Sequence, residues 1–261
     1  MNTTIKIVRY ELSDVLRGKW VVAYGAFFWL VTDALLRFGG GTKALLSLVN
    51  VVLLLIPLVS LVFGTTYLYH ARAFNMLLLT QPVSRRSLFA GLYAGLALPL
   101  ATAFAVGVSL PFAYRGLEAG HAGALATLLA CGILLTGIFT ALAFWVALRF
   151  EEKIKGLGAA LVLWLAAAVL YDGAVLLAAH AFAAYPLEQP MLVLMVLNPI
   201  DLARVLLLMA LDASALMGYT GAVFERFFGS MLGAAVSVGA LGAWLALPLG
   251  LALGRFRRQD F

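Results

Sequence analysis

The sequence predicts an all-α integral membrane protein with six transmembrane helices, and three observations lead to this fold class. Of the 261 residues, 64% are hydrophobic and only 11% are charged, whereas soluble domains are about half apolar and about a quarter charged. The mean hydropathy is correspondingly high, at +1.03. Apolar runs of the roughly 20 residues needed to cross a bilayer recur along the chain. No segment has a soluble domain's composition, so residues 1–261 are expected to form a single transmembrane domain.

The first segment, residues 1–19, has the pattern of an amphipathic helix lying in the membrane interface. Ile5, Val8 and Leu12 are spaced by three and four residues, with basic residues between them, as in interfacial helices. A soluble cytoplasmic tail is the alternative. The segment lacks the apolar run and the small-residue cleavage site of a signal peptide. We therefore expect its apolar face to contact membrane lipid.

Six apolar segments follow, and each is interpreted as a transmembrane helix. They are expected at about residues 20–36, 44–66, 93–113, 122–148, 156–183 and 230–253. Six spans leave only five of the 18 basic residues on one side of the membrane: Arg37, Lys43, Arg115, Arg204 and Arg226. The positive-inside rule places the other side, and with it both termini, in the cytoplasm. Topology thus explains the net charge of +6, and no long basic block indicates nucleic-acid binding.

Residues 185–229 are expected to form a helical region on the extracytoplasmic side. Met191–Leu211 is apolar enough to suggest a seventh span, but the Asn198-Pro199 pair and the charge of Asp201 interrupt it. A seventh span would also send the arginine-rich C-terminal segment outside. We expect two short helices instead, split at the Asn-Pro pair. The aspartate would lie near the start of the second helix, where the helix dipole favours an acidic group.

The sequence contains no recognisable catalytic motif. Walker A, H-E-x-x-H, G-x-S-x-G and C-x-x-C patterns are all absent. His70, His121 and His180 are expected at different faces or depths of the membrane, so they predict no metal site. Met191 and Met195 are of the type that contacts soft Cu(I), although methionine also commonly fills gaps in apolar helices. If the protein does work, its energy comes from a partner.

Asp172 is the clearest ionisable residue inside a predicted span. It follows Gly156 by about 16 residues, which at about 1.5 Å per residue puts it in the outer half of the span. An intramembrane carboxylate is costly and is commonly functional. One interpretation makes Asp172, with His180 two turns further on, part of a translocation path or polar membrane site. The other makes it a paired or hydrated residue near the outer interface.

The stretch Tyr67–Leu92 is a cytoplasmic interruption between the second and third spans, and we interpret it as a coupling region. A helix over Ala71–Thr80, ended by Pro82, would gather its apolar residues on one face and suit a groove of a soluble domain. The alternative is an interfacial helix lying against lipid. The residues expected to contact the partner are Arg72, Phe74, Asn75, Leu77, Leu78, Gln81, Arg85 and Arg86. In the loop 149–155, Glu151 and Glu152 form either a smaller second contact or an ordinary solvated turn.

Three stretches of the chain resemble permease subunits of the ABC-2 type of transporter. They are IVRYELSDVLRGKW at 7–20, LLLTQPVSRRSLFAGL at 77–92 and RFRRQDF at 255–261. Residues 197–204, LNPIDLAR, and the Tyr171-Asp172 pair are similar to the NosY type within this family. One departure is YHARA at 69–73, which stands where relatives often carry an acidic, glycine-containing stretch. This departure either alters the details of ATPase docking or marks a different subgroup.

The resemblance implies a permease subunit of the bacterial inner membrane, without a catalytic site of its own. It implies a homodimer bound to two copies of a separate, NosF-like ATPase, which holds ATP and Mg²⁺, so this chain would bind no cofactor. Tyr67–Leu92 would contain the main coupling helix. A periplasmic NosD-like protein would dock on the outer region through Asn198, Asp201 and Arg204. The complex would export or deliver a sulfur species or copper for the copper–sulfur cluster of nitrous oxide reductase.

Two other classes of function compete with this interpretation. An ATP-independent membrane scaffold or secondary transporter would need no ATPase. A secondary transporter should show inverted repeats or several buried ionisable residues, and Asp172 is the one clear candidate in the sequence. A membrane-embedded enzyme would need polar residues clustered at one depth, and the predicted topology indicates no such cluster.

Overall fold

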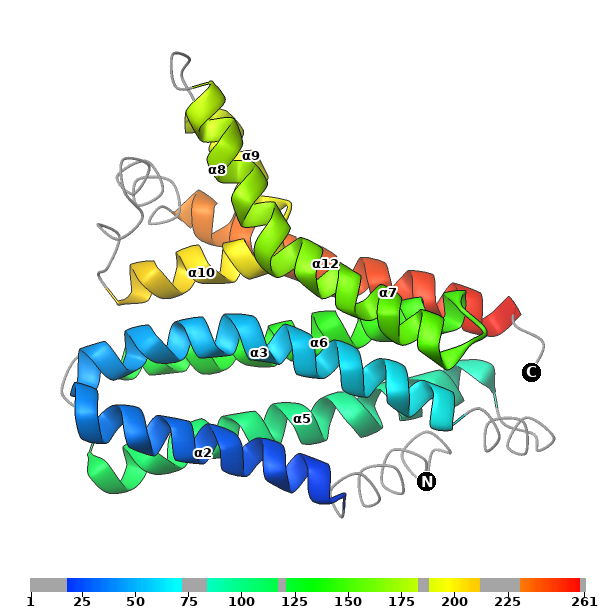
Figure 1. The fold of residues 1–261 in the computed structure, drawn as a ribbon, viewed down its shortest axis with the longest axis horizontal. Coiled ribbons are helices and arrows are strands. Elements are labelled where there is room, and N and C mark those ends of the chain that lie inside the picture. The colour runs from blue at the N-terminus through cyan, green and yellow to red at the C-terminus, as the bar shows by residue number, and fades with distance from the viewer. Residues whose placement is uncertain (1–17, 72–83, 117–120, 183–187, 212–230, 259–261) are drawn as a thin grey trace.

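The computed structural model describes residues 18–71, 84–116, 121–182, 188–211 and 231–258. The regular structure of these residues is helical throughout (Figure 1). The helices are α2 (Lys19–Gly39), α3 (Gly41–His70), α5 (Arg85–Arg115), α6 (Ala122–Arg149), α7 (Lys153–Leu165), the π-helix η1 (Ala166–Leu170), α8 (Tyr171–Ala181), α9 (Glu188–Val196), α10 (Pro199–Ala210) and α12 (Met231–Arg258). We call the continuous rod of α7, η1 and α8 span five. With α2, α3, α5, α6 and α12 it gives six candidate membrane spans among the described residues, which confirms the predicted fold class.

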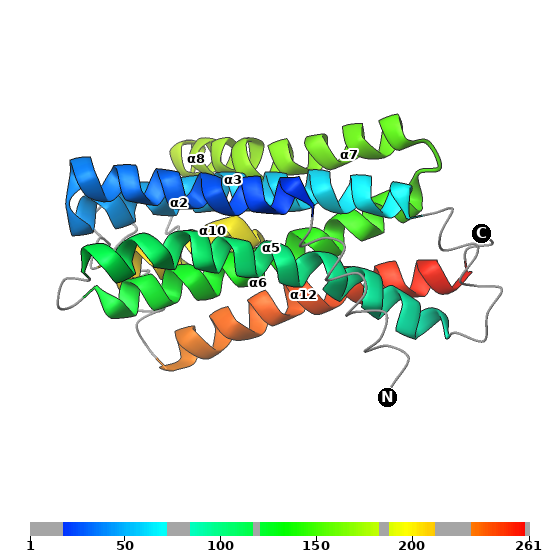
Figure 2. The ribbon, with the colours of Figure 1, turned by 90° about the horizontal axis from the view of Figure 1, so that it is seen from below.

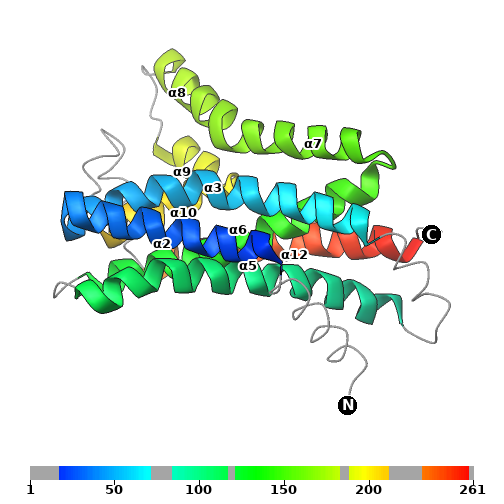
Figure 3. The same ribbon diagram turned by 60° about the horizontal axis from the view of Figure 1, so that its bottom comes forward.

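The long helices α2, α3, α5, α6 and α12 lie side by side along the long axis of the molecule (Figures 1 and 2). One end of this bundle holds the start of α2, the end of α3, the start of α5 and the end of α12 (Figure 3). It carries Lys19, His70, Arg85, Arg149, Lys153 and Arg255, and we call it the basic end. The opposite end, which holds the turns at Gly40 and Gly116, is called the far end.

The connection between α2 and α3 is a single residue, Gly40. Its φ of 72° is in the left-handed region, which glycine adopts without steric cost. The turn is therefore shorter than the interval between the predicted spans at about residues 20–36 and 44–66, because α2 continues to Gly39 and α3 begins at Gly41.

An aspartate ties α2 to α5 at the far end. Asp33 Oδ1 accepts hydrogen bonds of 2.6 Å from both Tyr114 Oη and Arg115 Nε, and its Oδ2 lies 2.8 Å from Arg37 Nε. Three donors therefore neutralise and orient a carboxylate that would be costly to leave unpaired near the membrane.

The predicted coupling region lies between two well-defined helix ends. α3 continues to His70, so the residues from Tyr67 to His70 belong to this helix rather than to a separate segment. α5 begins at Arg85, and Ser84 Oγ caps it by accepting a 3.1 Å hydrogen bond from Ser87 N, as serine commonly does at a helix N-terminus.

α3 and α6 form the centre of the bundle, and small residues allow the helices to approach closely. A Cβ added at Gly64 in α3 would lie 2.6 Å from the Cβ of Ala143 in α6. A Cβ added at Gly107 in α5 would lie 2.5 Å from the carbonyl oxygen of Gly25 in α2. The largest fully buried side chains are Phe28, Phe104, Phe139, Phe144 and Phe256.

Span five leans away from the bundle as it approaches the far end (Figures 1 and 3). Only 6% of its apolar stretch is buried, against 50% for each of α3, α5 and α6. Its α7 part packs mainly on α3, where Trp164 Nε1 donates a 3.1 Å hydrogen bond to the carbonyl oxygen of Leu54. Span five is therefore a rod attached to the bundle at a few points.

α9 and α10 form a bent pair of helices, residues 188–210, which we call the re-entrant hairpin. The bend of 111° lies between Val196 and Pro199, so the predicted split at Asn198-Pro199 is confirmed. The expectation of a helical region on the extracytoplasmic side needs revision for α10, because this helix packs among α6, α3 and α12 rather than outside the bundle. Most of α10 is buried. This burial is possible because its charged residues, Asp201 and Arg204, form ion pairs inside the protein.

Candidate functional site

A cluster of charged and polar side chains joins the re-entrant hairpin to span five. Arg204, on α10, donates hydrogen bonds of 2.8 Å from Nη1 to Asp172 Oδ2 on α8 and to Asp201 Oδ1 on its own helix. The Asp201 side chain is 3% exposed, whereas those of Asp172 and Arg204 are about one-third exposed. One guanidinium thus serves two carboxylates, which leaves a formal charge of −1 on the trio. We call these three residues with Asn198 the hairpin cluster.

Asn198 holds the break of the hairpin in place through three hydrogen bonds. Its Oδ1 accepts a 3.0 Å bond from Ile200 N and so caps α10, while Pro199 occupies the first turn, where a missing N–H is harmless. Its Nδ2 donates to Asp201 Oδ2 at 3.1 Å and to the carbonyl oxygen of Ala167 at 2.8 Å. The Asn-Pro-x-Asp segment therefore begins α10 and is also hydrogen-bonded to span five.

Asn198 contacts span five at the π-helix η1, which ends just before Tyr171 and Asp172. π-helical turns are rare and occur frequently at functional sites. Ala167, whose carbonyl oxygen accepts from Asn198, lies within η1. Tyr171, the residue after η1, donates a 2.6 Å hydrogen bond from Oη to the carbonyl oxygen of Leu194 on α9. Span five is thus bonded to both halves of the hairpin at the place where its helical pitch changes.

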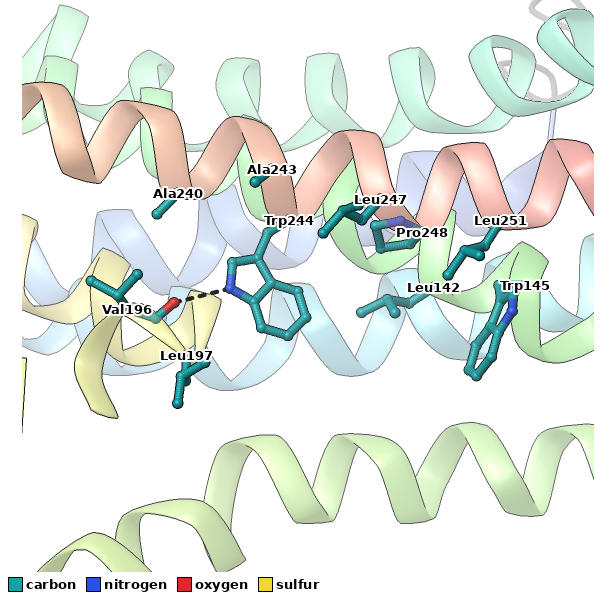
Figure 4. Close-up of a pocket in the computed structure, with 10 residues that line it drawn as sticks. All are labelled: Leu142, Trp145, Val196, Leu197, Ala240, Ala243, Trp244, Leu247, Pro248 and Leu251. Carbon is teal, nitrogen blue, oxygen red and sulfur yellow. Dashed lines mark hydrogen bonds between the residues drawn. The ribbon is translucent and has the colours of Figure 1, made fainter. Parts of the chain in front are cut away.

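An apolar groove adjoins the hairpin break on the side facing α6 and α12 (Figure 4). It encloses about 440 Å³. Trp244 Nε1 on α12 donates a 3.1 Å hydrogen bond across it to the carbonyl oxygen of Val196, as Figure 4 shows. The groove is lined by Leu142, Trp145, Val196, Leu197, Ala240, Ala243, Trp244, Leu247, Pro248 and Leu251. With this lining it suits an apolar chain and offers nothing to hold an ion.

At the basic end, side chains join the predicted coupling region to the loop at 149–155. Tyr69 Oη, in the last turn of α3, donates a 2.7 Å hydrogen bond to the carbonyl oxygen of Phe150. The next residue, His70, has its Nε2 3.0 Å from Lys153 Nζ. These bonds therefore join the described ends of the two loops that are expected to contact a partner.

The C-terminal helix is tied into the same end of the bundle. Arg255 Nε donates a 2.9 Å hydrogen bond to the carbonyl oxygen of Leu148, at the end of α6. Arg85 Nη1, at the start of α5, donates a 2.9 Å hydrogen bond to the carbonyl oxygen of Arg257. Basic side chains stabilise the carbonyl groups at helix C-termini in this way.

Comparison with known proteins decides the family. Residues 5–261 match the model of the ABC-2 family transporter proteins. The chain belongs to the ABC-2 transporter family. A Pseudomonas aeruginosa protein named probable ABC transporter permease protein NosY is 30% identical over 272 residues, covering 97% of each chain. A Stutzerimonas stutzeri protein of the same name is 29% identical over 278 residues, covering 99% of each chain.

The residues that the sequence predicted as ATPase contacts of this ABC-2 chain fall into two groups. Six lie outside the described residues: Arg72, Phe74, Asn75, Leu77, Leu78 and Gln81. The others frame the basic end. Arg85 bonds to the C-terminal helix and Arg86 is exposed in the first turn of α5. Glu151 and Glu152 are exposed between α6 and α7, where Glu152 Oε1 lies 2.7 Å from Lys155 Nζ.

The predicted membrane and outer residues of this ABC-2 chain are brought together differently from the expectation. Asp172, interpreted either as part of a translocation path or as a paired or hydrated residue, is paired with Arg204, which was predicted as a periplasmic contact. His180 is exposed in the last turn of α8, away from Asp172 along the helix. Asn198 and Asp201 are each 2% exposed, so only Arg204 of the three predicted contact residues offers surface to a partner in this conformation.

The sequence predicted no contact for Tyr69 or Tyr171, which were noted only within the YHARA stretch and the Tyr171-Asp172 pair, because a tyrosine next to a polar residue is common and carries no local signal of a partner. The Asp172–Arg204 pair spans 32 positions, so no helical periodicity connects its members. Within the described ranges, no group of three or more His, Cys, Asp or Glu side chains is placed to hold a metal ion.

Proposed function

We propose that this ABC-2 chain is a permease subunit whose helices are moved by a separate ATPase bound at the basic end. The family assignment supports an ATP-driven transporter, and the sequence has no Walker A motif to bind the nucleotide itself. The excess of Lys and Arg at the basic end supports a position of that end in the bacterial cytoplasm. ATP and Mg²⁺ would then be held by the partner, and this chain would bind no cofactor.

The observation that carries the proposal is the hydrogen bond from Tyr69 Oη to the carbonyl oxygen of Phe150. It joins the last turn of α3, which precedes residues 72–83, to the loop at 149–155, so the described ends of the two proposed ATPase contacts form one bonded unit. In such a unit the coupling helix would dock into the ATPase through Phe74, Leu77 and Leu78. A second copy of the chain would complete the membrane part, with one ATPase for each copy.

The hairpin cluster is the part of the membrane domain that we propose to respond to this movement. A charged trio inside the bundle has few stable arrangements, because separating Arg204 from either aspartate leaves an unpaired charge in a medium of low dielectric. Movement of span five would therefore carry the re-entrant hairpin with it. We propose that Asp172 lies on the translocation path at this joint, with His180 further out along the same helix.

The proposed cargo is a sulfur species or copper for assembly of the copper–sulfur cluster of nitrous oxide reductase. Its support is the likeness to the two proteins named NosY, at about 30% identity over nearly the whole chain. A NosF-like ATPase would bind inside, and a periplasmic NosD-like protein would bind at the far end.

The test is complementation in a bacterium whose own copy of this gene is deleted. Nitrous oxide reductase should regain the absorption of its copper–sulfur cluster when the chain is supplied with an active ATPase. It should not regain it when the ATPase binds but does not hydrolyse ATP. Full cluster assembly with the inactive ATPase would contradict an ATP-driven function.

One observation favours a second candidate, a secondary transporter driven by an ion gradient. Asp172, Asp201 and Arg204 gather several ionisable groups within the membrane domain, as such transporters require. Collapse of the proton gradient at constant ATP separates the two candidates. Only the secondary transporter would lose activity at once.

A further inference from the structure

We propose that Tyr69 is the positioning residue that passes movement of the coupling region directly to span five. This inference rests on the proposed function, because it concerns how the ATPase's movement reaches the membrane. Tyr69 lies in the last turn of α3, three residues before the segment 72–83.

The tyrosine is seated on the start of α7 as well as bonded to the loop. A Cβ at Gly156, in the first turn of α7, would overlap Tyr69 Oη and come within 2.8 Å of the ring atoms Cε2 and Cζ. The ring therefore occupies the space that any other residue's side chain would need. Its Oη also donates to the carbonyl oxygen of Phe150, which caps α6. One side chain thus fixes α3 against both the end of α6 and the beginning of span five.

Span five has few other attachments through which it could be moved. Only 6% of its apolar stretch is buried, and its contact with the bundle is concentrated in α7, which packs on α3. At the basic end, Tyr69 packs on Gly156, and His70 Nε2 lies 3.0 Å from Lys153 Nζ. Deeper in the membrane, Trp164 bonds to Leu54. The hairpin cluster follows beyond them. Tyr69 and His70 make the contacts nearest to the coupling region, so a shift of that region reaches span five first at this end of α3. Of the two residues, Tyr69 is the one that contacts both the end of α6 and the first turn of α7.

A purely structural role for Tyr69 would show as poor assembly, whereas a positioning role would show as lost transmission in an assembled complex. The experiment therefore uses the full chain with its ATPase in lipid nanodiscs. A single spin label is placed at Leu177→Cys, a position on α8 that is 73% exposed, after Cys131→Ala removes the only native cysteine. The signal is the change in the label's environment when a non-hydrolysable ATP analogue and Mg²⁺ are added.

Two substitutions break the contact in different ways, and each has a matched control. Tyr69→Phe removes only the donor, and Gly156→Ala displaces the ring. Tyr93→Phe removes a comparable 2.9 Å bond, to the carbonyl oxygen of Gly137, between α5 and α6. Gly158→Ala adds a methyl group two residues from Gly156, where nothing lies within 4 Å.

We expect Tyr69→Phe and Gly156→Ala to reduce the nucleotide-induced change about fivefold, as the loss of one hydrogen bond allows. Binding and ATP hydrolysis by the ATPase should stay unchanged, and both controls should respond like the parent. A full response in both Tyr69→Phe and Gly156→Ala would overturn the role of Tyr69 and leave the proposed function standing. A parent complex that shows no nucleotide response would overturn both.

Discussion

Arg204 Nη1 lies 2.8 Å from Asp172 Oδ2 and so bonds the re-entrant hairpin to span five across 32 positions of sequence. The same nitrogen also lies 2.8 Å from Asp201 Oδ1. The pair therefore places the membrane carboxylate at the joint between the re-entrant hairpin and span five rather than alone in lipid.

Asp172→Asn should impair transport without loss of assembly. The amide keeps the shape of the side chain but removes the charge that holds Arg204 to span five. We expect the export or cluster-assembly signal to fall about tenfold, since coupling free energies are typically about 1–3 kcal/mol. The measurement is the cluster signal at equal amounts of purified complex. Asp172→Glu, which retains the charge, should recover part of it, and full activity of Asp172→Asn would return the residue to a structural role.

Arg204→Met should destabilise the protein because it leaves two carboxylates without their shared partner. Removing one member of a buried ion pair costs about 3–5 kcal/mol, and the lower end applies because Arg204 and Asp172 are about one-third exposed. Thermal unfolding in detergent measures this loss. The double variant Arg204→Met, Asp201→Asn should regain stability, because the most buried charge is then gone. Equal losses in the single and double variants would show that the charges are not the cause.

Substitutions at Asn198 should separate its capping role from its grip on the π-helix. Asn198→Ala loses every side-chain bond and should cost about 2 kcal/mol. Asn198→Ser can still cap α10, but it loses the donor to the carbonyl oxygen of Ala167. It should therefore cost about 1 kcal/mol and weaken transport. If Asn198→Ser matches the parent in both thermal unfolding and transport, the bond to the π-helix contributes neither to stability nor to transport.

Much of the fold follows from local patterns. Composition and apolar length predict six spans, and the Asn198-Pro199 pair predicts the split of the hairpin, because both signals lie within a few residues of the feature they determine. The end of α3 was placed at Thr66 instead of His70, since amphipathic residues such as Tyr67 and Tyr69 suit a helix end and a loop equally well.

The contacts of the candidate site could not be predicted in the same way. Asp201 and Arg204 suggested a solvent-facing region because charged residues are rarely buried. Asp201 is buried because Arg204, on the same helix, pairs with it, and Arg204 in turn pairs with Asp172 on a different helix. The π-helix at 166–170 and the seat of Tyr69 on Gly156 likewise depend on partners distant in sequence. Long-range pairing of this kind leaves no periodic signal in a single chain.

Co-purification of the ATPase tests the central claim most directly. Phe74→Glu with Leu78→Glu places charge on the apolar face proposed to dock into the ATPase. Phe38→Glu is the matched control, because Phe38 is 91% exposed at the far end. We expect the double variant to be made and inserted normally but to lose the ATPase and its ATP turnover, while Phe38→Glu retains both. An ATPase that co-purifies and turns over ATP equally well with the double variant would contradict the account.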